Sequence, residues 1–168
     1  FKNLQELKDN LKKSIEDQKK KEVDQKNELK VLDKILEKSK FGDIADDLIK
    51  SESQLMMREI EQNIISQGGK LDDYLSSIGK NYDQLMLEMM PNAVKRVKSA
   101  LILKEVAKVE KMEAEEKEID EKLIALKEQY KDNAEAVKNI TSPAYRAYLA
   151  NFILNQKVVE NLKKWNLI

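Results

Sequence analysis

The side chains that could carry out chemistry in this sequence are carboxylates, lysines, arginines and tyrosines, because its 168 residues include no histidine and no cysteine. Without these two residue types the chain can build neither a Ser–His or Cys–His nucleophile nor a histidine- or thiolate-ligated zinc site. Its 31 acidic residues will bring carboxylates together by chance on almost any helix. We therefore expect no catalytic residue, no metal and no cofactor.

Glu52 stands out among the carboxylates, because it shares a predicted helix face with Leu48 and Ile60. A charge in an apolar face needs a partner or a place at the edge of the packed surface, so we expect a surface or structural ion pair. A group of basic residues comes later: Lys95, Arg96, Lys98, Lys104, Lys108 and Lys111. Glutamates interrupt this group and the formal net charge is zero. The sequence thus favours a solvated helix face and predicts no nucleic-acid partner.

The composition predicts helices throughout. Charged residues make up 37% of the chain and apolar residues 41%, which is enough apolar surface for a folded core. Only four glycines and two prolines occur. No apolar run approaches the ~18 residues that a membrane span needs, so we expect no membrane partner. The sequence begins at Phe1 rather than Met, and we expect it to be part of a longer chain.

The spacing of apolar residues and of helix-ending residues predicts an all-α fold without strands. The expected helices cover about 3–38, 45–66, 72–78, 81–111, 115–130, 134–140 and 143–164. At ~1.5 Å per residue, the first and the fourth would span roughly 50 and 45 Å. A compact chain of this size is only about 40 Å across. We therefore expect an elongated multi-helix domain with a long N-terminal helix and projecting helical arms.

Local signals define several helix ends. Gly79 is expected at the position after a helix, where a left-handed backbone is favoured. Asn81 and Ser142 are typical N-caps, and Pro143 suits the first helical position. Pro91 lies inside the fourth helix and should bend it.

The apolar pattern also predicts which faces are packed. The first helix has an almost purely polar middle, so we expect it to be held by packing at its two ends. On the last helix one apolar face is expected to point inward: Tyr145, Leu149, Phe152, Ile153, Val159 and Leu162.

One stretch of the fourth helix is unusually apolar. It contains Met86, Met89 and Met90, and then an apolar block, residues 100–103, that includes Leu101 and Leu103. Because such a block surrounds a whole turn, it is either buried between several helices or lines a cradle in which Leu101 and Leu103 contact a client, and the sequence favours burial. The methionines either form a core stripe or also contact a binding partner, since flexible, polarisable side chains suit promiscuous surfaces.

The order of several stretches resembles the C-terminal domain of the trigger factor family of bacterial chaperones. The stretches are DDLIKSESQLMMREIEQNI, GGKLDDYLSSIGKNYDQL and PNAVKRVKSALILKEVAKVEKME, preceded by FKNLQELKDNLKKSIED and followed by KEIDEKLIALKEQY and ILNQKVVENLKKW. Matching details include Tyr74, Leu75 and the Arg96–Lys98 triplet, whereas Ala45 stands where the family usually has proline. The resemblance covers essentially the whole chain. It implies one helical chaperone domain with a connecting helix (1–40), a body with a long kinked helix (41–111) and an arm with a returning helix (112–168).

The resemblance further implies an ATP-independent chaperone that binds unfolded or nascent polypeptides in the cytoplasm. The family's ribosome-binding and proline-isomerase domains are missing here, so we expect contact with the ribosome only through a missing domain, and no isomerase activity. Self-association into a homodimer is also implied. Leu126, Tyr130, Val137 and Ile140 resemble positions that contact clients in the family. From the residues alone, the same four side chains could equally form local packing between two short helices.

Two alternatives to a general chaperone remain open at this stage. The chain could be a non-catalytic helical scaffold for one specific protein partner. It could also be a fragment of a periplasmic chaperone of the parvulin-linked kind, whose helical body is similar.

Overall fold

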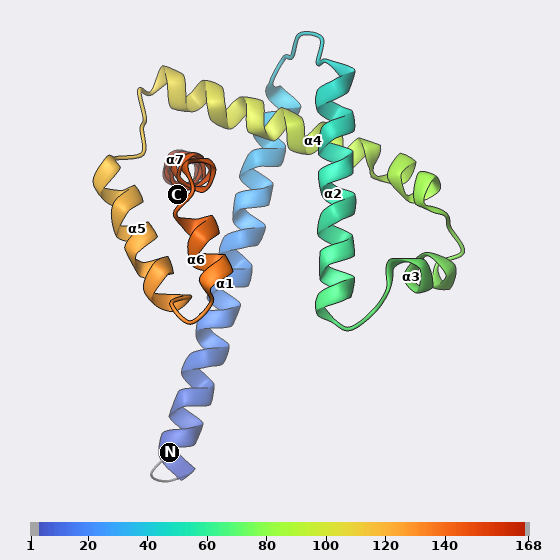
Figure 1. Ribbon diagram of the computed structural model, residues 1–168. Coiled ribbons are helices and arrows are strands. Elements are labelled where there is room, and N and C mark those ends of the chain that lie inside the picture. Colours follow the sequence, from blue (N-terminus) through green and yellow to red (C-terminus); the bar gives the residue numbers. More distant parts are fainter. Residues whose placement is uncertain (1–3, 167–168) are drawn as a thin grey trace. The chain divides into compact units, whose positions relative to one another are not determined.

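A computed structural model describes residues 4–166, which form seven helices with no strand among them (Figure 1). The helices are α1 (Leu4–Lys38), α2 (Asp46–Ser66), α3 (Leu71–Ser77), α4 (Tyr82–Val109), α5 (Glu116–Gln129), α6 (Ala134–Ile140) and α7 (Pro143–Asn166). The all-α class and the long N-terminal helix are confirmed, although the residue at which α1 was expected to begin lies outside the described part. Within residues 4–166, no helix is long and apolar enough to cross a membrane.

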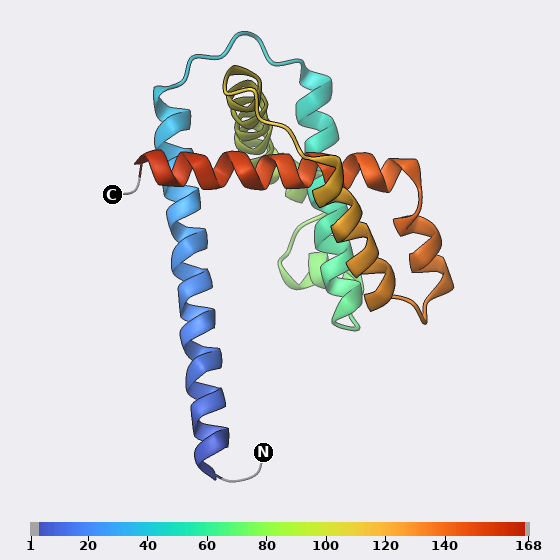
Figure 2. The ribbon, with the colours of Figure 1, turned by 90° about the vertical axis from the view of Figure 1, so that its left-hand side faces the viewer.

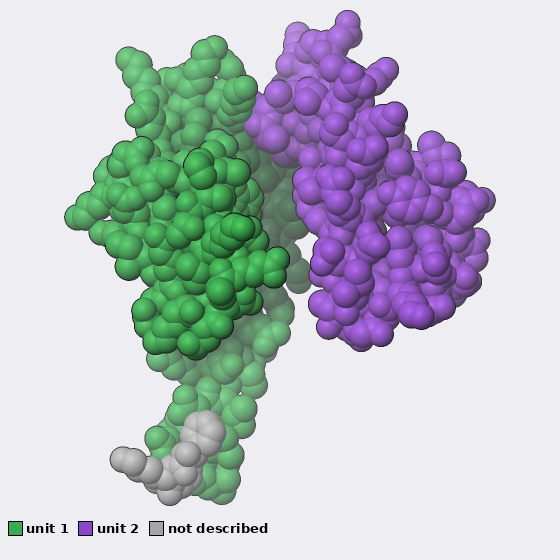
Figure 3. Space-filling model, viewed as in Figure 1, with its two compact units in different colours: residues 1–37, 103–168 green, residues 38–102 purple. Residues whose placement is uncertain are grey.

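The chain forms two compact units (Figure 3). Unit 1 combines Phe1–Glu37 with Leu103–Ile168, and unit 2 is Lys38–Ile102. The boundary near residue 102 falls inside α4, so this helix contributes its first part to unit 2 and its last part to unit 1. The expectation of a single domain in three sections stays a prediction.

The helix ends follow the local signals in the sequence. Gly79 has a φ of 66°, the left-handed backbone that glycine adopts without strain. The Gln84 N–H donates to Asn81 Oδ1 while the Asn81 N–H donates to Gln84 Oε1, each at 2.9 Å, which is a reciprocal cap. The Tyr145 N–H donates to Ser142 Oγ at 3.1 Å. α4 continues through Pro91, and the bend expected there stays a prediction.

Unit 2 is built around a methionine-rich cluster that we call the α2–α4 core, formed by Met57, Leu75, Leu85 and Met89. Ser53 is completely buried nearby, and its hydroxyl donates to the Ile49 carbonyl at 3.0 Å. The core therefore ties α2, α3 and the first part of α4 together.

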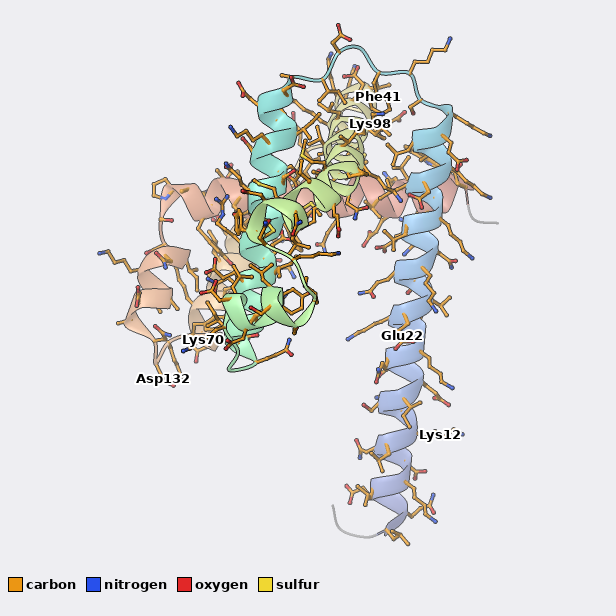
Figure 4. The ribbon with its side chains drawn as sticks, turned by 90° about the vertical axis from the view of Figure 1, so that its right-hand side faces the viewer. Lys12, Glu22, Phe41, Lys70, Lys98 and Asp132 are labelled. Carbon is orange, nitrogen blue, oxygen red and sulfur yellow. The ribbon has the colours of Figure 1, made fainter. Side chains whose placement is uncertain are left out.

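Charged side chains support this unit from outside. Arg96 Nε lies 2.9 Å from Glu52 Oε1, and its terminal nitrogens donate to both carboxylate oxygens of Glu59 at 2.8 and 3.0 Å. The ion pair expected for Glu52 is thus confirmed. Lys98 Nζ lies 5.1 Å from the centre of the Phe41 ring, a cation–π contact (Figure 4).

Unit 1 contains two separate cores, and α7 contributes to both (Figure 2). The α5–α7 core joins α5, α6 and α7 through Ile119, Leu123, Ile140, Leu149 and Ile153. The α1–α7 core joins α1, the end of α4 and α7 through Val31, Ala107, Val158 and Leu162.

The prediction that packing holds both ends of the first helix is wrong for its N-terminal end. Leu4, Leu11 and Ile15 are more than half exposed, whereas Val31 near the other end is buried. The N-terminal half of α1 carries side-chain pairs along its own surface, such as Lys12 with Glu16 and Gln18 with Glu22 (Lys12 and Glu22 are labelled in Figure 4). Such pairs stabilise a helix only slightly, by about 0.2–0.5 kcal/mol each.

Candidate functional site

The described residues offer no site for metal chemistry. Within residues 4–166, no group of three or more carboxylates is arranged to hold a metal ion. The candidate functional surface is therefore formed by apolar side chains that remain accessible.

An accessible apolar surface of unit 1 lies on α7, between the two packed sides of this helix. Leu149 and Ile153 enter the α5–α7 core, and Val158 and Leu162 enter the α1–α7 core. At about 100° per residue, these two sets occupy different sides of the helix. The side between them is not covered by either core, and it carries three further apolar residues, Tyr148, Phe152 and Val159. We call these three residues the α7 face.

The aromatic rings of this face are ordered along the helix. The Tyr148 side chain is 60% exposed and that of Phe152 42%, although both are large and apolar. Their ring centres are 6.4 Å apart with planes inclined by 25°, and the half-buried Tyr145 ring lies 5.7 Å from that of Tyr148. The result is a short row of aromatic rings with its outer surface in solvent.

Cavities adjoin the α7 face on both sides. One, of about 520 Å³, lies between α5 and α7 and is lined by Glu118, Glu121, Lys122, Ala125, Ile153, Gln156, Lys157 and Glu160. Another, of about 210 Å³, lies between α1 and α7 and is lined by Glu28, Phe152, Asn155, Gln156, Val159 and Glu160. Gln156 and Glu160 line both, so the hollow surface continues across α7. Figure 2 shows α1 and α5 crossing α7 at different points along its length.

Ion pairs fix the walls of these cavities. Lys157 Nζ lies 2.5 Å from Glu118 Oε2 and donates to the Glu113 carbonyl at 3.2 Å. The hydrogen bond from Lys157, helped by the Glu115 N–H, lowers the pKa of Glu118. Lys163 Nζ lies 2.9 Å from Glu28 Oε1, and this contact raises the pKa of Lys163. Each lysine therefore joins α7 to a neighbouring element.

Arg146 makes a further clamp between α7 and the first turn of α5. Its guanidinium donates to Glu116 and, at 2.6 Å, to Asp120 Oδ1. The hydrogen bonds from Arg146 to Asp120 and then to Glu116 raise the pKa of the guanidinium. Both carboxylates are largely in solvent and the Arg146 side chain is partly exposed, so the clamp positions the two helices more than it stabilises the fold.

The site residues that the sequence suggested in unit 1 have very different accessibility. Tyr130, just after α5, is 43% exposed. Leu126 and Val137 are half-buried, and Leu126 packs against the α5–α7 core. Ile140 is a buried member of that core, while Leu103 is half-buried against the α1–α7 core. The structure thus brings Leu126 and Ile140 together at the α5–α7 core, whereas Leu103 lies at the α1–α7 core.

Two of the suggested residues in unit 2, Met86 and Met89, belong to the α2–α4 core or pack against it. Met89 is buried in it, and Met86 packs against it from a half-buried position. Met90 is half-buried, and its sulfur lies 3.1 Å from the Ser53 hydroxyl oxygen. Leu101 is 38% exposed, so the expected burial of the apolar block on every side does not hold at this residue. Client contact by the suggested residues of both units stays a prediction.

The prediction of which side chains of the last helix point inward is wrong for Phe152, which is exposed. It also left out Val158, which is fully buried. Sequence reasoning also missed Tyr148 as a surface residue. A signal was present, because Tyr145, Tyr148, Leu149 and Phe152 supply more apolar positions at helical spacing than one packed side can cover.

The basic residues of α4 and of the turn after it lie on the helix surface, where several of them contact side chains of the same chain. Arg96 and Lys98 have the partners described above, and Lys108 lies 3.7 Å from Glu105. These contacts agree with the prediction of an ordinary helix surface.

Comparison with known proteins gives a consistent result. A family model described as "Bacterial trigger factor protein (TF) C-terminus" matches residues 3–164. A trigger factor of Caldanaerobacter subterraneus subsp. tengcongensis is 37% identical over 138 residues, which cover 82% of this chain and 32% of that protein. Trigger factors of Agathobacter rectalis and Clostridium botulinum are 29% and 28% identical, over 94% and 98% of this chain and 35% and 38% of their own length. The chain therefore spans about a third of the curated relatives that it matches. No solved structure matches it.

Proposed function

Because the chain belongs to the family of bacterial trigger factor C-terminal domains, we propose that it is a chaperone domain that binds unfolded or nascent polypeptides without ATP. The observation that carries this proposal is the α7 face, whose aromatic rings stay in solvent beside cavities of unit 1. An accessible apolar surface of this kind is typical of a binding site for other polypeptides.

The energetics of the α7 face suit reversible capture. Burying one such side chain contributes about 1.5–3 kcal/mol, so two or three contacts hold a client weakly. The surrounding Glu and Lys residues keep the face in solution and limit association between chaperone molecules. A client can therefore leave without any input of energy from a nucleotide.

The residues suggested from the sequence are proposed as additional contacts according to their accessibility. Tyr130 and Leu101 are exposed enough to meet a client directly. Five others offer part of their surface: Leu126, Val137, Met86, Met90 and Leu103. Met89 and Ile140 are buried, so in this structure they support the neighbouring surfaces rather than line them.

The proposed role is binding only. We propose neither ribosome docking nor prolyl isomerisation for this chain. We place the chain in the cytoplasm with its family, and a homodimer is a further proposal that sedimentation at several concentrations would test.

A general chaperone and a scaffold for one partner differ in what they protect. We expect the chain, without ATP, to suppress the aggregation of several unrelated proteins diluted from denaturant, as measured by light scattering. A scaffold for one specific partner would protect none of them, and that result would overturn the proposal. The fully helical far-UV circular dichroism spectrum of the same sample serves as the control for folding.

A further inference from the structure

Two side-chain amides flank the α7 face. Asn155 lines the cavity between α1 and α7, and Gln156 lines both that cavity and the one between α5 and α7. At about 100° per residue, Asn155 lies on one side of the line through Phe152 and Val159, and Gln156 lies on the other. The apolar line therefore has an amide on each side.

Both amides are available to a ligand. Each side chain is exposed, and within residues 4–166 neither makes a hydrogen bond to another part of the chain. An amide offers a carbonyl acceptor and two N–H donors, so it can match either the N–H or the C=O of a peptide group. The neighbouring lysines, by contrast, are held in ion pairs with Glu118 and Glu28.

The spacing of the aromatic rings matches an extended polypeptide. In a strand, side chains on the same side repeat every second residue, or about 6.6 Å. The ring centres of Tyr148 and Phe152 are 6.4 Å apart along α7. When alternate side chains of a strand rest on these rings, its backbone N–H and C=O groups point away from the strand on both sides. Asn155 and Gln156 lie on these two sides of the apolar line.

We propose that Asn155 and Gln156 hydrogen-bond the backbone of an extended client segment whose apolar side chains rest on the α7 face. This inference rests on the proposed function and explains how the domain binds clients of many different sequences. Backbone groups are the same in every sequence, so hydrogen bonds to them add affinity without selecting a sequence. They also satisfy peptide groups that would lose water when the client covers the apolar surface.

The test compares a double variant, Asn155→Ala with Gln156→Ala, with the unaltered chain. The probe is a fluorescent peptide of alternating apolar and polar residues, and its dissociation constant is measured by anisotropy. Two lost hydrogen bonds should weaken binding roughly fivefold to a hundredfold. A matched control replaces amides that line neither cavity, Gln129→Ala with Asn151→Ala, and should leave the affinity unchanged.

A second probe shows whether the backbone is the partner. In this peptide, ester bonds replace alternate amide bonds, which removes backbone N–H donors but keeps the side chains. The unaltered chain should bind it more weakly, and the double variant should lose less affinity for it than for the normal peptide.

Equal affinity of the unaltered chain and the double variant for the normal peptide would overturn the inference while leaving the proposed function intact. The same holds if the variant loses affinity equally for both peptides, since the amides would then act on something other than the backbone. If the unaltered chain bound neither peptide, the proposed function would fail as well.

Discussion

The Met112 N–H donates a hydrogen bond of 2.8 Å to the carbonyl of Ala107, five residues earlier, and the two side chains share the α1–α7 core. This bond closes the C-terminal end of α4 in the arrangement known as a Schellman motif. The residue between the end of the helix and Met112 that must turn the chain is Lys111, whose φ is 52°. The left-handed position that usually holds glycine is therefore occupied here by lysine.

Lys111→Gly should stabilise the chain. A residue with a Cβ atom loses about 1–2 kcal/mol in the left-handed region, and glycine avoids this loss at the cost of extra freedom in the unfolded state. We expect a net gain of about 0.5–1 kcal/mol in the free energy of unfolding, measured with urea. Lys111→Ala retains the Cβ atom and removes the charge, and it should give no comparable gain. An equal gain for both variants would show that the lysine charge, and not the backbone, is the cause.

The exposed rings of α7 should matter for binding and little for stability. Tyr148→Ser with Phe152→Ser removes most of the α7 face, so the affinity for an unfolded client should fall at least tenfold. Since both rings are exposed and neither belongs to a buried core, the free energy of unfolding should change by less than about 1 kcal/mol. Anisotropy titration and urea unfolding of the same preparation measure the two effects.

The matched control is Leu149→Ala on the same helix. Leu149 is 4% exposed in the α5–α7 core, so its truncation should cost about 2–5 kcal/mol of stability. If the Tyr148 and Phe152 variant unfolded as easily as this control, the rings would be structural and the α7 face would not be a binding surface.

Tyr130 and Ile140, which the sequence placed in one client-contacting group, should respond differently to mutation. Ile140→Ala leaves a cavity in the α5–α7 core and should lower the free energy of unfolding by about 2–4 kcal/mol. Tyr130→Ser changes an exposed side chain after the end of α5 and should alter stability by less than about 0.5 kcal/mol. Thermal melts followed by circular dichroism distinguish the two, and similar melts for both variants would contradict the packing described here.

The sequence predicted the elements well because their ends depend on local signals. Gly79, Asn81 and Ser142 act on residues three or four positions away, and the structure has each in its expected role. The number, order and approximate bounds of the helices followed from such signals.

The faces of the helices were harder to predict, because they depend on partners distant in the chain. α7 packs Ile153 on one side and Val158 on another, and a prediction with one inward face could not separate these cores. It placed Phe152 inside and gave Val158 no role. The candidate binding surface was missed for the same reason, since it is defined by what α1 and α5 leave uncovered.

Stability should fall in acid partly because Glu59 loses its charge. The hydrogen bond from Arg96 lowers the pKa of Glu59 below its ordinary value of 4.5, ahead of the opposing effect of burial. A carboxylate whose pKa is lower in the folded state adds stability above the unfolded pKa, and this contribution disappears as the pH falls through the folded pKa. At pH 7, Glu59→Gln should therefore cost up to about 1 kcal/mol, since both side chains of the pair are partly exposed to solvent. Below the folded pKa the variant and the unaltered chain should be equally stable in urea titrations. Glu61→Gln, on the same helix but without a bond to Arg96, is the matched control and should leave the stability at pH 7 nearly unchanged. A constant Glu59→Gln deficit at every pH would exclude the ion pair as its cause.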